Sequence, residues 1–125
     1  MQVAKISDAL RPELIDRYVK HLRQAFGPGL AELDDGVLRP RVEQTVLRAH
    51  GLGLRAPLDE LRFLNLAASF GWQFDQDTPW VGPMLRDGSI PEPSERLRRV
   101  KARFVRQLQL AQHNFQVRQG ADSTP

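Results

Sequence analysis

The stretch PLDELRFLNLAASFGWQFDQDTPW, residues 57–80, indicates that this chain folds as packed helices. Apolar residues recur in it at steps of three and four, namely Leu61, Leu64 and Ala68. This spacing places them on one face of a helix. Proline favours a first helical turn and glycine a helix end, so we predict a helix that begins near Pro57 and ends at Phe70–Gly71.

Two carboxylates one residue apart, Asp75 and Asp77, raise the question of a metal site. A calcium-binding loop that starts at Asp75 would place Pro79 and Arg86 where the fifth and twelfth positions need oxygen ligands. A nucleotide-sugar enzyme that uses Asp-x-Asp needs an α/β fold, which a helical chain does not supply. We therefore expect neither metal nor cofactor here.

A helix cap explains the same residues without a metal. We predict a short helix from about Thr78 to Leu85 that carries Trp80, with Asp77 or Thr78 as its N-cap. Carboxylates are stabilised near the positive end of a helix.

Two further helices are predicted on the N-terminal side. In residues 6–29, apolar and aromatic residues occupy every fourth position: Leu10, Leu14, Tyr18, Leu22 and Phe26. Pro12 fits the first turn of this helix, and Ser7 or Asp8 is its expected cap. The next helix is expected from about Asp35 to His50 with these residues inward: Leu38, Val42, Val46 and Ala49.

The last helix is predicted to be the longest, from Glu95 to about Arg118, with Ser94 as its N-cap. Its apolar residues form a narrow seam suited to packing along other helices: Leu97, Val100, Phe104, Leu108, Ala111 and Phe115.

Together these elements predict an all-α, single-domain bundle of four to five helices with a long C-terminal helix. The helical domain would cover residues 1–119, and residues 120–125 would form a disordered tail. The expected core consists of Leu14, Tyr18, Leu22, Val46, Leu61, Leu64, Phe74, Trp80, Leu85 and Phe104. A chain of 125 residues is long enough to bury such a core without a metal or disulfide.

The composition limits the compartment and the chemistry. The chain has no cysteine, and it lacks both the apolar run of a signal peptide and a membrane-spanning stretch, so we expect a cytoplasmic location and no membrane contact. The three histidines lie on three different predicted helices, and no serine has a nucleophile-elbow context. We expect no enzyme activity.

Positive charge is concentrated in one segment. Residues 95–106, ERLRRVKARFVR, carry a net charge of +5, more than the +3 of the whole chain. Their helical spacing places four arginines on one face: Arg96, Arg99, Arg103 and Arg106. This face is either solvated, or binds an acidic protein, or binds nucleic acid. No aromatic residues alternate with the arginines and no helix-turn-helix pattern is evident, which disfavours nucleic acid.

The order of motifs from residue 46 to residue 85 resembles a helical module of bacterial type VI secretion loci, found in effector-adaptor proteins and in small stand-alone proteins encoded beside spike and toxin genes. The residues that match its pattern are Arg48, Ala49, Gly51, Phe70, Gly71, Phe74, Asp75, Asp77, Pro79 and Trp80. The resemblance implies a co-chaperone or adaptor that helps to load a toxin onto the secretion spike, with no catalytic residues. The specific motif covers about 40 residues, and the larger recognition domain of the full adaptors is absent from this sequence.

The expected partner is thus another protein, namely an effector chaperone, an adaptor or a toxin, with a second copy of the chain as a further candidate. The expected contact residues lie on the last helix: Arg96, Arg99, Arg103, Arg106, Leu108, Ala111 and Phe115. The alternative function is nucleic-acid binding through the basic face of residues 95–106.

Overall fold

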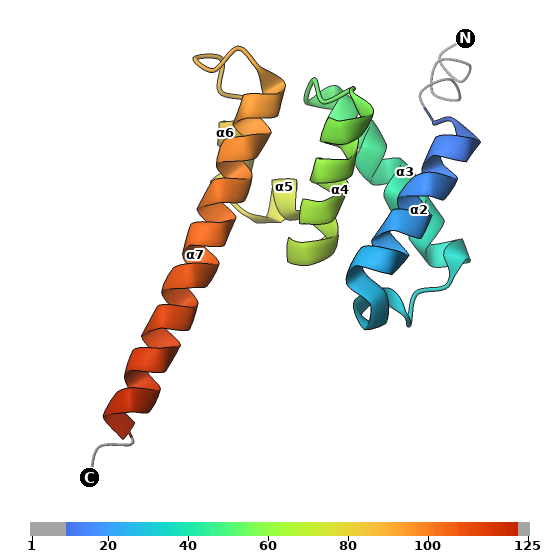
Figure 1. Ribbon diagram of the computed structural model, residues 1–125. Coiled ribbons are helices and arrows are strands. Elements are labelled where there is room, and N and C mark those ends of the chain that lie inside the picture. The colour runs from blue at the N-terminus through green and yellow to red at the C-terminus, as the bar shows by residue number, and fades with distance from the viewer. Residues whose placement is uncertain (1–9, 123–125) are drawn as a thin grey trace.

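The computed structural model describes the backbone of residues 10–122 and the side chains of residues 10–117. Within these residues the regular elements are helices and no strand occurs, which confirms the all-α fold. The helices, with one short 3₁₀ turn, are α2 (Pro12–Phe26), η1 (Gly27–Leu30), α3 (Asp35–Gly51), α4 (Pro57–Phe70), α5 (Phe74–Asp77), α6 (Val81–Leu85) and α7 (Pro93–Asp122). Figure 1 shows α4 in the middle, between the α2 and α3 pair and the long α7.

Helix α4 is central because it is apolar on more than one face. Leu64 contributes to a cluster with α2 and α3, whose other buried members are Ile15, Tyr18, Val19, Leu22, Leu30, Leu38, Val42 and Val46. Phe63, Leu66 and Ala67 contribute to a second cluster with α3, α5, α6 and α7. A helix that is apolar around most of its circumference is stable only when neighbours cover it on several sides. The sequence predicted only the first of these two faces.

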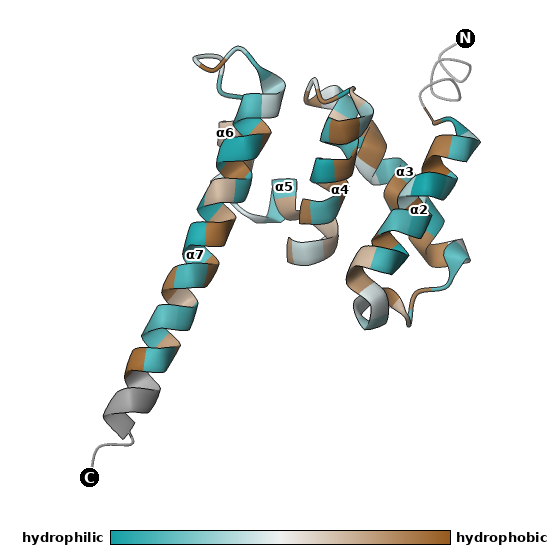
Figure 2. Cartoon of the chain, in the orientation of Figure 1, coloured by the Kyte–Doolittle hydropathy of each residue, from teal (hydrophilic) through white to brown (hydrophobic). Residues whose placement is uncertain are grey.

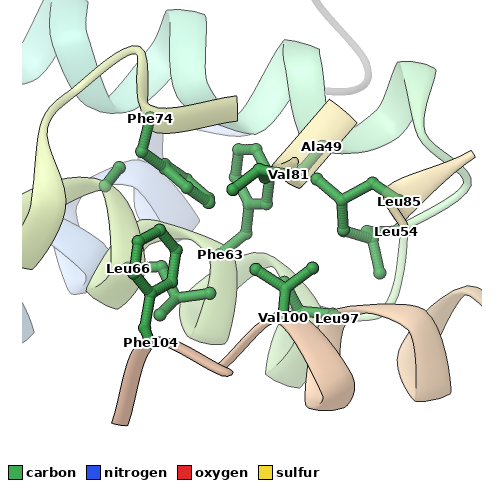
Figure 3. Close-up of a cluster of buried hydrophobic side chains, with 11 residues drawn as sticks. Ala49, Leu54, Phe63, Leu66, Phe74, Val81, Leu85, Leu97, Val100 and Phe104 are labelled. Carbon is green, nitrogen blue, oxygen red and sulfur yellow. The ribbon is translucent and has the colours of Figure 1, made fainter. Parts of the chain in front are cut away.

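The second cluster is built around aromatic rings. Phe104 of α7 stacks on Phe70 with 4.0 Å between ring centroids and approaches Trp80 at 4.7 Å and Phe74 at 6.1 Å. Figure 3 shows Phe104 and Val100 of α7 facing Phe63 and Leu66 of α4. These contacts hold α7 against the bundle, since aromatic pairs add to the energy of apolar burial.

Seven of the ten predicted core residues are buried, and three lie at the edge of the core. Leu14, Leu61 and Trp80 are only partly buried against the clusters. For Trp80 the reason is its place at the turn before α6, where one side of the ring packs on Phe104 and the guanidinium of Arg103 lies over the ring, 4.3 Å from its centroid.

The helix predicted from about Thr78 to Leu85 ends as expected but begins three residues later, as α6 at Val81, and a further short helix, α5, precedes Thr78. Proline disfavours helical dihedrals in the residue before it, and Thr78, which precedes Pro79, is extended with φ −96° and ψ 110°. The cap predicted for this helix is wrong, because neither Asp77 nor Thr78 caps α6. Trp80 occupies the N-cap position of α6, and no side chain caps it.

The helix starts also differ from the predicted caps. Arg11 is the N-cap of α2, and the expected caps, Ser7 and Asp8, lie outside the described residues. Helix α7 begins at Pro93, so Ser94 lies inside the first turn rather than at the cap. Its hydroxyl instead donates a hydrogen bond to a carboxylate oxygen of Asp59 in α4, at 2.5 Å.

The far end of α7 continues past the predicted end near Arg118, as far as Asp122. Of the predicted tail, 120–125, the last three residues lie outside the described part of the chain. The near end of α7 is fixed to α4, and the far end projects away from the other helices in Figure 1.

Candidate interaction surface

The two halves of the motif from residue 48 to residue 80 meet in space. Arg48 of α3 lies with its Nε 3.3 Å from both carboxylate oxygens of Asp75, and its Nη2 donates to the carbonyl oxygen of Trp72. The Asp75 side chain is 8% exposed and that of Arg48 22% exposed. This ion pair therefore ties α3 to the corner between α4 and α5.

Other motif residues shape the same corner. Gly71 has φ 123°, which side chains rarely tolerate, and it ends α4. Ala49 and Phe74, one from each half of the motif, are buried in the same cluster. By contrast, Gly51, Asp77 and Pro79 are exposed. The buried part of the motif thus serves the fold.

The two carboxylates of the Asp-x-Asp pair have different surroundings. Asp75 faces the guanidinium of Arg48, whereas Asp77 is exposed. Among the described side chains, no three His, Asp or Glu residues are gathered where they could hold a metal ion.

A buried polar network is centred on Glu60 of α4, and the sequence patterns did not predict it. The hydroxyl of Tyr18 donates to Oε1 of Glu60 at 2.6 Å, and Nε2 of His50 is hydrogen-bonded to Oε2 of the same carboxylate. The Glu60 side chain is 2% exposed. Burial, and then the hydrogen bond to Glu60, raise the pKa of Tyr18 well above its usual range. The network joins α2, α3 and α4.

A signal for this network exists in the sequence. Tyr18 stands in an apolar stripe, and a buried tyrosine hydroxyl requires a hydrogen-bond partner. Its partner lies 42 residues away, so helical periodicity could not identify it. The other histidines lie elsewhere: His21 bonds to Asn65 of α4, and His113 is exposed on α7.

The apolar seam of α7 is buried as far as Phe104 and exposed beyond it. Leu97, Val100 and Phe104 are buried, and every side chain from Val105 to Val117 is exposed. We call Leu108, Ala111 and Phe115 the exposed seam; Leu108 is 52% exposed and Phe115 61%. Figure 2 shows hydrophobic residues recurring among polar ones along this part of α7. At 1.5 Å per residue, residues 105–117 extend about 20 Å beyond the last buried position.

The four predicted arginines have different surroundings. Arg96 donates to the carbonyl oxygen of Ile90 at 2.6 Å and so closes the loop before α7. Arg99 donates to Glu95 at 3.2 Å, and the exposed guanidinium of Arg103 lies over Trp80.

Next to these arginines is an open groove of about 570 Å³ between α6 and α7. It contains three arginines beside apolar side chains and no acidic residue; we call it the basic groove, defined by Met84, Arg99, Ala102, Arg103, Arg106 and Leu110. Leu110, 55% exposed, was missed as a candidate contact. It lies on the helical face that the arginines occupy one and two turns earlier.

Hydrogen bonds from Arg98 and Arg99 lower the pKa of Glu95 to about 2. This carboxylate therefore stays charged at neutral pH and neutralises part of the basic segment. Glu95 accepts three hydrogen bonds, two from Arg98 and one from Arg99, and Arg103 and Arg106, which lie further toward the C-terminal end of α7, are not among its partners.

In the part of the chain that the structure describes, no helix combines the length and the apolar character needed to cross a membrane. A scan against models of known protein families, and searches of curated proteins and of solved structures, find nothing that matches this chain.

Proposed function

We propose that this protein is a non-catalytic interaction module that binds another protein and acts as an adaptor or co-chaperone in loading a type VI secretion effector onto the spike. The observation that carries the proposal is the projecting half of α7, whose side chains from Val105 to Val117 are all exposed. Most helical stability in proteins comes from the packing of an apolar face, which the exposed residues 105–117 lack and a binding partner would supply. The type VI assignment rests on the motif resemblance from Arg48 to Trp80.

The basic groove indicates the chemistry of the partner. Arginine forks bind carboxylates in pairs of hydrogen bonds, and Met84 and Leu110 offer apolar contact beside them. An acidic protein segment with apolar side chains complements this lining. The charges would accelerate association more than they strengthen the final complex.

The test compares two variants with the same change in charge. Arg99→Glu/Arg106→Glu reverses two charges in the basic groove, and Arg98→Glu/Lys101→Glu reverses two charges on α7 outside it. Each pair includes one arginine that binds Glu95, so both variants lose an ion pair with this carboxylate; Arg98 gives it two hydrogen bonds and Arg99 one. The tagged proteins are recovered from the native host, and co-purifying proteins are identified by mass spectrometry.

We expect secretion-system proteins to co-purify with the original chain and with Arg98→Glu/Lys101→Glu, and to be lost with Arg99→Glu/Arg106→Glu. Equal loss in both variants would show that general charge, and not the groove, governs capture. Recovery of no secretion-system protein from the original chain would reject the type VI role.

Nucleic-acid binding is the second candidate, favoured by the absence of acidic residues from the basic groove. Neutralising several phosphates releases counterions, so such binding weakens steeply as salt is raised. Enrichment of nucleic acid in place of protein, with a steep salt dependence that Arg99→Glu/Arg106→Glu removes, would favour this candidate.

A further inference from the structure

A series of side-chain contacts leads from the core to the basic groove and ends at the guanidinium of Arg103. Phe70 of α4 stacks on Phe104 of α7 with 4.0 Å between ring centroids, and Trp80 packs beside Phe104 at 4.7 Å. The guanidinium carbon of Arg103 lies over the Trp80 ring, 4.3 Å from its centroid. Phe104 is buried and Trp80 partly buried, so the core holds in place the ring on which Arg103 rests.

The guanidinium of Arg103 keeps most of its hydrogen-bonding capacity. Its Nη1 donates to Sδ of Met84 at 3.7 Å, and a thioether sulfur is a weak acceptor. Arg98 and Arg99 both bind Glu95, whereas no carboxylate of the described residues forms an ion pair with Arg103. Arginine can contact an aromatic ring with the face of its planar guanidinium and a carboxylate with the edge. The contact with Trp80 is therefore compatible with an anionic ligand.

We propose that Arg103 is the residue of the basic groove that recognises a carboxylate of an acidic protein segment, and that Trp80 is the positioning residue that orients its guanidinium. A side chain that is already held loses less conformational freedom on binding than a free one. Arg106 lines the same groove, but no aromatic ring of the described residues carries its guanidinium. This inference rests on the proposed function and deepens it, because it assigns recognition of the acidic partner to one side chain.

The surroundings of Arg103 favour a protein segment over nucleic acid. Met84 and Leu110 line the groove together with Arg103, and a protein segment can present apolar side chains beside its carboxylates. Single-stranded nucleic acid is bound largely by aromatic rings on which its bases stack. Trp80 is already in contact with Arg103 and Phe104, so it offers little free surface to a base.

The proposed function and this inference can fail separately, because the first is tested by capture in the native host and the second by a synthetic ligand on the purified chain. Secretion-system proteins captured in the host, together with equal binding of the synthetic ligand by the original chain and by Arg103→Lys, would leave the proposed function standing and reject this inference.

The first test is isothermal titration calorimetry of the purified full chain with a synthetic helical peptide. Arg99, Arg103 and Arg106 recur about once per turn of α7, so the peptide carries one glutamate per turn on one face, with leucines beside the glutamates. One control peptide has glutamine in place of every glutamate. The control for phosphate recognition is a double-stranded DNA oligonucleotide at the same salt concentration.

We expect the glutamate peptide to bind at least about tenfold more tightly than the glutamine peptide, because hydrogen bonds between charged groups are the strong ones. The DNA should bind no more tightly than the glutamate peptide. Absence of binding by the glutamate peptide up to about 1 mM, equal binding of the two peptides, or tighter binding of the DNA overturns the inference.

Two conservative variants separate recognition by Arg103 from general charge. Arg103→Lys and Arg106→Lys both keep the positive charge and lose the planar fork, but only the first removes a guanidinium held on an aromatic ring. We expect Arg103→Lys to weaken binding of the glutamate peptide at least about tenfold, and Arg106→Lys about twofold or less. Equal weakening by the two variants would show that the groove acts through charge alone, and would overturn the assignment to Arg103.

A double-mutant cycle tests Trp80 as the positioning residue. Trp80→Leu should weaken peptide binding by the original chain about fivefold, and should leave binding by the Arg103→Lys chain nearly unchanged, because the fork that Trp80 orients is already lost. Circular dichroism checks that each variant stays helical. Equal weakening in both chains would mean that Trp80 acts only through the fold, and would reject its positioning role.

Discussion

At the scale of single residues, the ion pair of Arg48 with Asp75 is the contact that makes one unit of two separate sequence motifs. Both side chains are mostly withdrawn from solvent, and Arg48 also binds the Trp72 carbonyl. Removing one member leaves a mostly buried group without its partner, which costs more than losing an exposed ion pair.

We expect Arg48→Ala and Asp75→Ala each to lower the free energy of unfolding by about 2 kcal/mol, as measured by urea denaturation. The double variant should cost about 1 kcal/mol less than the sum of the two, because the second change removes a group already unpaired. Strictly additive costs would show that the two residues act independently and that the pair does not hold the corner.

Tyr18 gives a second residue-scale prediction. Its pKa in the folded protein is raised above the ordinary 10.0, so the neutral hydroxyl is stabilised by folding. This contribution to stability is complete below pH 10 and is lost as the pH rises toward the folded pKa. Raising the pH above 10 should therefore destabilise the original chain more than Tyr18→Phe.

The measurement is direct because Tyr18 is the only tyrosine. The ultraviolet absorbance of tyrosinate should appear near pH 10 in denaturant and at higher pH in the native protein, with circular dichroism followed in parallel. Ionisation near pH 10 while the helices remain folded would contradict the buried hydrogen bond to Glu60.

At the scale of elements, α7 combines an anchored half with a projecting half. Phe104 is 6% exposed within a group of three aromatic neighbours, and Phe115, on the same face, is 61% exposed. We expect Phe104→Ala to cost about 3–5 kcal/mol, the usual range for a buried phenylalanine. Phe115→Ala should cost under about 0.5 kcal/mol when measured at a concentration where the chain is monomeric.

Amide hydrogen exchange under the same conditions should show rapid exchange in residues 107–117 and slow exchange around Phe104. Similar costs for the two phenylalanines, or equal protection along all of α7, would mean that the projecting half is packed against the bundle.

The element boundaries were predicted best where proline and glycine mark them. Pro12, Pro57 and Gly71 start or end helices as expected, because these residues restrict the backbone locally. At Pro79 the predicted helix start was three residues too early, because proline disfavours helical dihedrals in the residue before it and α6 begins only at Val81. The sequence was sufficient to predict this effect, because Thr78 directly precedes Pro79.

Other features depend on contacts between distant parts of the chain. The second apolar face of α4, with Phe63 and Leu66, can be recognised as buried only once α7 is known to pack on it. The burial of the Glu60 carboxylate is explained only by its hydrogen bonds to residues of α2 and α3. In the same way, the seam residues from Phe104 to Phe115 look alike in the sequence, and the place where the bundle ends determines which of them are exposed.

At the scale of the whole molecule, the protein is a small bundle that presents a long helix. The start of α7 is bonded to α4 through Ser94 and Asp59, and Phe104 fixes its middle, so the projecting half has a defined direction from the bundle. A bundle with this shape can present the basic groove and the exposed seam to different partners. We expect the groove side of the projecting half to bind another protein.

Photocross-linking in the native host tests whether this side of α7 contacts a partner. A photoreactive amino acid is placed at Leu110, and in a separate variant at Leu58 of α4, which is apolar and 57% exposed, close to the 55% of Leu110. We expect covalent adducts with secretion-system proteins at Leu110 and not at Leu58. No protein adduct at Leu110 beyond those at Leu58, or adducts with nucleic acid in their place, would contradict it.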